Sequence, residues 1–171
     1  MEIFLLLLFV LILWLPQNIQ HEGMHAIIAK LFGAEEVKIY PLPTWGPKSW
    51  IPKYFAYMTY RNLPKDTSDF KRGFISCAPQ IANTLVIAFV ILANIILPLP
   101  AMLSIFLFAL ILVNFIDGAT NLGSLLVRKE GHSNDAWDAI KHFKISTGVG
   151  RIMVFFWYLI LGIPSLLIFL G

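Results

Sequence analysis

Four long apolar segments dominate the chain and limit the folds open to it. They run over residues 2–32, 68–96, 100–127 and 148–170. A helix needs about 20 apolar residues to cross a bilayer, and each segment exceeds that length. Only 13% of the 171 residues are charged, whereas a soluble domain carries about 25%. We therefore expect an all-α polytopic membrane protein with about four transmembrane helices, folded as a single domain over residues 1–171.

The basic residues indicate how these helices are oriented. All 13 Lys and Arg residues lie between Lys30 and Arg72 or between Arg128 and Arg151. Lys and Arg are enriched in cytoplasmic loops. We therefore expect the loops 33–67 and 128–147 in the cytoplasm and both termini outside. The net charge of +3 follows from this bias and does not indicate a nucleic-acid partner.

The loop after the first apolar segment is the least helical part of the chain. Residues 36–40 alternate polar and apolar side chains before Pro41 and Pro43, and residues 54–60 are rich in aromatic side chains. Both patterns are typical of short strands. We expect a small membrane-associated β region at this point.

A cluster of polar residues interrupts the first apolar segment. His21 and His25 are four residues apart, so both imidazoles project from one helix face and can reach a Zn²⁺ ion at about 2.1 Å. A carboxylate at Glu22 can act as the general base on a metal-bound water. The alternative is a pair of histidines packed in a polar helix core. Burying the carboxylate of Glu22 in lipid is costly unless it is paired or functional, which favours the metal site.

A catalytic zinc site needs a third protein ligand, and two aspartates compete for this role. Asp117 lies eleven residues before the basic end of its helix, and His21 lies nine residues before Lys30. At about 1.5 Å per residue, Asp117 and His21 then lie at comparable depth. Asp135 follows a basic turn and is expected near the cytoplasmic surface. We therefore favour Asp117 as the third ligand and keep Asp135 as its rival.

Asn83 is a further polar residue at membrane depth, in the second apolar segment. Its amide can donate a hydrogen bond to a substrate carbonyl or to the oxyanion that develops in the transition state. A hydrogen bond between helices is the alternative. The sequence does not favour either role.

Three motifs resemble those of the site-2 protease family of intramembrane zinc metalloproteases, and they occur in the family's order. The stretch from His21 to His25 is similar to the family's first core helix. Residues 78–83 resemble its Gly-Pro-x-x-Asn segment, with Ala78 in place of Gly. Asp117 and Gly118 resemble its Asp-Gly ligand motif.

The resemblance implies a zinc ion bound by His21, His25 and Asp117, with Glu22 as the base. It implies hydrolysis of a peptide bond in or near a transmembrane segment of a membrane-protein substrate, within the lipid bilayer. The β region would then pair with the unwound substrate by strand addition. The chain departs from the family because only Asn114 stands where an Asn-Leu-Leu-Pro stretch is usual, and because there is no room for a PDZ domain. No feature indicates an oligomeric state.

A ZIP-like divalent metal transporter is the main alternative function. Residues 114–118 also look like the metal motif of those transporters, but the two motif helices here come in the reverse order. Val113 replaces an expected His, and the paired repeats that are usual in transporters are absent from the sequence. A bis-His haem protein would need histidines on facing helices, whereas His132 and His142 lie in the second loop.

Overall fold

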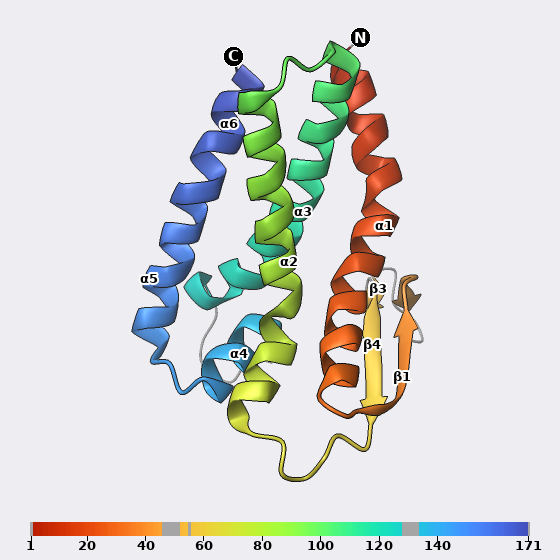
Figure 1. Ribbon diagram of the computed structural model, residues 1–171, viewed down its shortest axis with the longest axis vertical. Coiled ribbons are helices and arrows are strands. Elements are labelled where there is room, and N and C mark those ends of the chain that lie inside the picture. The colour runs from red at the N-terminus through yellow and green to blue at the C-terminus, as the bar shows by residue number, and fades with distance from the viewer. Residues whose placement is uncertain (1, 46–51, 55, 128–133, 171) are drawn as a thin grey trace.

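The computed structural model describes residues 2–45, 52–54, 56–127 and 134–170. Four helical segments are long and apolar enough to cross a membrane. They are α1 (Glu2–Leu31), α2 (Asp69–Ile96), α3 (Ala101–Val127) and a continuous run of α5 (Thr147–Trp157), η1 (Tyr158–Gly162) and α6 (Ile163–Leu170). The expected all-α, multi-pass membrane fold is confirmed. Figure 1 shows both termini at one end of the bundle, while the membrane side on which that end lies stays a prediction.

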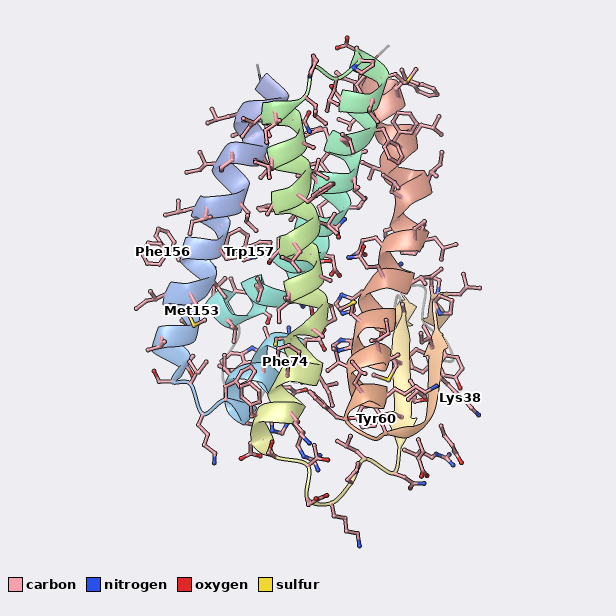
Figure 2. All side chains as sticks on the ribbon, viewed as in Figure 1. Lys38, Tyr60, Phe74, Met153, Phe156 and Trp157 are labelled. Carbon is pink, nitrogen blue, oxygen red and sulfur yellow. The ribbon has the colours of Figure 1, made fainter. Side chains whose placement is uncertain are left out.

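Apolar side chains on the outside of the bundle indicate contact with lipid. Figure 2 shows Phe156 pointing away from the bundle, and Met153 and Phe156 are 56% and 52% exposed. Trp157, the next residue, points towards α2, where its Nε1 donates a hydrogen bond to Thr84 Oγ1 at 2.8 Å. An apolar surface of this extent is stable only when it is covered, and hydrocarbon can cover it.

The end of the bundle near the termini is held together by apolar packing. Its core consists of four buried side chains from three of the spans: Ile87, Val90, Ile111 and Leu161. The opposite half of the bundle contains the buried polar side chains of α1, namely Gln17, Asn18, His21 and His25. That half also contains buried apolar clusters, so it combines apolar packing with buried polar side chains.

The sheet region begins where α1 is terminated by Gly33. This residue has a φ of 90°, a conformation in which glycine avoids a steric penalty. Gly33 N donates to Lys30 O and Ala34 N donates to Ala29 O, the paired bonds of a Schellman motif. The chain then turns directly into the first strand.

The expected β region consists of two antiparallel pairs. Strand β1 (Glu35–Tyr40) pairs with β4 (Tyr57–Arg61), and β2 (Thr44–Trp45) pairs with β3 (Pro52–Tyr54). The rings of Tyr40 and Tyr57 stack with centroids 4.5 Å apart. In Figure 1 the β1–β4 pair lies beside the half of α1 that is remote from the termini.

A short helix, α4 (Asp135–His142), lies between the third and fourth spans and packs against α2. Asn134 caps its start by accepting a hydrogen bond from Trp137 N at 3.0 Å. The same side chain donates to Asn121 O and to Ser124 Oγ of α3. The N-terminus of α4 is therefore fixed against α3, and its C-terminal end lies beside Asp69 at the start of α2.

Candidate metal centre

The centre is built on one face of α1. His21 and His25 are both buried, and their ring centroids are 5.1 Å apart. Four residues of helix separate them, so their side chains project in the same direction. His25 lies six residues before Leu31, or about 9 Å from the end of the helix. The expected arrangement of the two imidazoles on one inward face is observed.

Asp135 is the carboxylate that approaches both imidazoles. Its Oδ2 is 3.0 Å from His21 Nε2 and 3.2 Å from His25 Nε2, and the three residues each offer one ligand atom within 4.8 Å of the other two. Two ligand atoms bonded to one tetrahedral Zn²⁺ ion at 2.0–2.1 Å lie about 3.3 Å apart. The group therefore has the donor types and the spacing of a metal site with three protein ligands.

The other nitrogen of each imidazole is held by a fixed acceptor. His25 Nδ1 donates to the carbonyl of Ile75 at 2.7 Å. His21 Nδ1 lies 2.7 Å from Asp117 Oδ2. Metal-binding histidines usually make such a contact with a carboxylate or a backbone carbonyl, because it fixes the ring orientation and its tautomer.

The hydrogen-bond chemistry of His25 favours a cation between the ligand atoms. A backbone carbonyl can only accept, so the Nδ1 that faces Ile75 carries the proton. In the neutral ring, Nε2 is then an acceptor, and it faces the oxygen of Asp135, which also only accepts when ionised. Two acceptors at 3.2 Å repel each other, and a shared metal ion converts that contact into a pair of favourable bonds.

In this geometry Asp135, and not Asp117, forms with His21 and His25 a group that could hold a metal ion. The short contact between Asp117 and His21 agrees with the equal depth expected for the two residues. However, Asp117 lies on the Nδ1 side of His21, away from the Nε2 that faces Asp135. Counting residues along α3 does not reveal that Asp135, the first residue of α4, lies against His21 and His25 of α1.

The charge of Asp135 suits a metal ligand. Burial by itself raises the pKa of this carboxyl, but the neighbouring imidazoles, chiefly that of His21, lower it overall to well below its usual range. Asp135 is therefore ionised at neutral pH. A deprotonated carboxylate is the form that binds a metal ion.

Glu22 lies beside this centre without taking part in the ligand group. It directly follows His21 and is half-buried. No hydrogen-bond or ion-pair partner for its carboxylate is found within the described ranges. A carboxylate without a partner beside three side chains that could hold a metal ion has the chemistry of a general base.

Amide side chains from three helices support the centre. Asn83 Nδ2 donates to Asp117 Oδ2 at 2.7 Å, and Gln20 Nε2 donates to the side-chain oxygens of both Asn83 and Asn114. Asn83 is therefore engaged in the interhelical hydrogen bonds that were the alternative to a substrate contact. The support by Gln20 and Asn114 was not predicted, although both are amides at the depth of the histidines in adjoining helices.

A cavity of about 440 Å³ lies at the other end of the bundle. Leu6 and Asn94 are among its lining residues. Leu6 precedes His21 by fifteen residues, or about 22 Å of helix. This cavity is therefore separate from the metal centre, and its lining contains none of the ligand residues.

No protein-family model, curated protein or solved structure matches this chain. The resemblance to site-2 proteases thus stays a prediction from the sequence motifs.

Proposed function

We propose that this chain is a zinc-dependent endopeptidase that hydrolyses peptide bonds in or near transmembrane segments of other proteins. The observation that carries the proposal is a group of three residues that could hold a metal ion, beside an unpartnered Glu22 on a helix long and apolar enough to span a membrane. Catalytic zinc sites have three protein ligands and leave one position open. The stretch from His21 to His25, which resembles the first core helix of site-2 proteases, agrees with this proposal.

Each residue of the centre has a distinct role in the proposed reaction. His21, His25 and Asp135 would hold the metal, while Asp117 and the carbonyl of Ile75 orient the two rings. A zinc ion bound there would polarise the scissile carbonyl and make water a nucleophile at neutral pH. Glu22 accepts a proton from the attacking water and returns it to the leaving amine.

The position of the centre selects the substrate class. His21 lies ten residues, or about 15 Å, from the end of a membrane-spanning α1. A soluble peptide does not reach a site at this depth, whereas a segment already in the bilayer does. We therefore expect substrates to be membrane proteins.

The substitution Glu22→Gln tests the proposal because it keeps the side-chain shape and removes the base. We expect unchanged zinc content by elemental mass spectrometry. Cleavage of a reporter fused to a single transmembrane helix should fall by about 10²–10⁴-fold, the usual contribution of a general base. The matched control is Glu36→Gln, because Glu36 is an exposed residue that forms a surface ion pair with Arg61.

Two results would contradict the peptidase proposal. One is cleavage of the reporter by Glu22→Gln at the wild-type rate. The other is zinc uptake into liposomes that contain Glu22→Gln, which would identify a metal transporter. Either result would leave the proposed metal-binding group unchanged and would reject the role of Glu22 as the general base.

A further inference from the structure

Two buried amide side chains on α1 have donor groups that remain unsatisfied. Gln17 and Asn18 are only 5% and 9% exposed. Gln17 Nε2 and Asn18 Nδ2 nevertheless have no hydrogen-bond partner among the residues that the structure describes. Ile19, the next residue, is 45% exposed, so the two amides belong to the inward face of the helix. Their donors are enclosed by the bundle without an acceptor.

Gln20, a partly buried residue of the same helix, shows that this bundle can provide acceptors for an amide. Its Nε2 donates to both Asn83 and Asn114, at 3.2 and 3.1 Å. A buried donor without an acceptor loses the hydrogen bonds that it would make with water, and hydrocarbon offers no replacement. The contrast on one helix indicates that the donors of Gln17 and Asn18 serve a group outside the chain.

Both amides lie one helical turn from the metal centre. Gln17 precedes His21 by four residues and Asn18 precedes Glu22 by four, so each shares a helix face with a residue of the centre. A helical turn rises about 5.4 Å, and an extended peptide rises about 3.3 Å per residue. When one carbonyl of an extended peptide lies at Glu22, the carbonyls one or two residues away are therefore level with the amides.

Peptide carbonyls are the acceptors that suit these donors. They are present in every sequence, and hydrolysis inside a bilayer needs a segment whose carbonyls have left their helical hydrogen bonds. Such carbonyls find no water in hydrocarbon. We propose that Gln17 Nε2 and Asn18 Nδ2 donate hydrogen bonds to backbone carbonyls of the bound peptide, on the side of the cleaved bond that faces the chain termini. This subsite rests on the proposed peptidase function and deepens it.

Binding of an uncut peptide isolates this subsite from the chemistry. The probe is a fluorescent apolar peptide of about 20 residues with a central Gly-Pro break, bound to the Glu22→Gln protein in nanodiscs. Gln17→Met and Asn18→Leu keep the approximate side-chain size and remove the donor. We expect each substitution to weaken binding of the probe about 3-fold, the average for an interhelical hydrogen bond in a membrane protein. Zinc content should not change.

Thermal unfolding separates a substrate contact from a structural role. Removing a buried donor that has no partner should leave Tm unchanged or raise it, because the resting protein loses no hydrogen bond. Gln20→Met is the matched control on the same helix. It breaks the contacts with Asn83 and Asn114 and should lower Tm.

The two proposals fail in different ways. Unchanged binding of the probe in both variants, or a fall in Tm as large as that of Gln20→Met, overturns the amide subsite. If the wild-type protein binds the probe, loses affinity on both substitutions and yet never cuts the peptide, the peptidase function is wrong and the subsite is supported. Absence of probe binding by the wild type contradicts both.

Discussion

Asp117 and Asp135 approach the same imidazole from opposite sides, and the regions that carry them are built differently. Asp117 lies within α3, where Asn83 donates to it from α2 and only 17% of its side chain is exposed. Asp135 begins a short helix outside the four spans, and 26% of its side chain is exposed. The orienting carboxylate thus belongs to the packed core of the bundle, and the candidate ligand belongs to an element that packs on that core.

This difference separates two requirements of a metal centre. An orienting contact works only when its position is fixed, and the hydrogen-bonded amides around Asp117 fix it. A ligand from α4 completes the group only when that helix is docked. The integrity of the centre therefore depends on the contacts of α4 as well as on the membrane core.

Asp135→Ala should have the largest effect on metal binding. It removes a ligand atom, so we expect zinc affinity to fall by more than about 100-fold, beyond the range for loss of an orienting contact. Elemental mass spectrometry of the purified protein and competition with a chelating dye would measure this loss. If Asp135→Ala binds zinc with wild-type affinity, Asp135 is not a ligand and Asp117 becomes the candidate.

Asp117→Ala should have a smaller effect because the three ligand atoms stay in place. We expect zinc affinity to fall by about 10–100-fold, since His21 loses the partner that fixes its ring. Asp117→Asn, which keeps an acceptor oxygen, should retain more affinity than Asp117→Ala in the same titration. If Asp117→Ala is as damaging as Asp135→Ala, the distinction between orienting residue and ligand is wrong.

The sequence is sufficient to predict the parts of this centre that lie on single helices. The length and apolar character of each segment predict the spans, and the spacing of His21 and His25 places both on one face. Counting residues also brings Asp117 to the level of His21. Each of these predictions needs only the regular rise and twist of one helix, or the parallel course of two.

Other contributions depend on contacts that a sequence does not encode locally. The backbone carbonyl of Ile75 fixes the ring of His25. Because every residue has such a carbonyl, the sequence carries no signal for this contact. The position of Asp135 depends on the path of a loop and on the docking of α4. An Asn at position 134 indicates the start of that helix. It does not indicate that the Asn134 side chain also contacts Ser124 of α3.

Asn134→Ala tests how α4 holds Asp135 and should have a smaller effect than either aspartate substitution. It removes a helix cap, which usually stabilises by about 1 kcal/mol, and the contacts with Asn121 and Ser124. All ligand and orienting atoms remain. We expect a lower Tm and a loss of zinc affinity of less than about 10-fold, measured by thermal unfolding and dye competition.

Lys144→Ala is the control for the opposite end of α4. Lys144 Nζ lies 3.2 Å from Asp69 Oδ2, but the two side chains are 79% and 52% exposed, and exposed ion pairs add little stability. We expect no measurable change in Tm or zinc affinity. If Lys144→Ala instead matches the loss in Asn134→Ala, then the surface pair fixes the helix, and Asp135 is held from the far end of α4 rather than by its capped N-terminus.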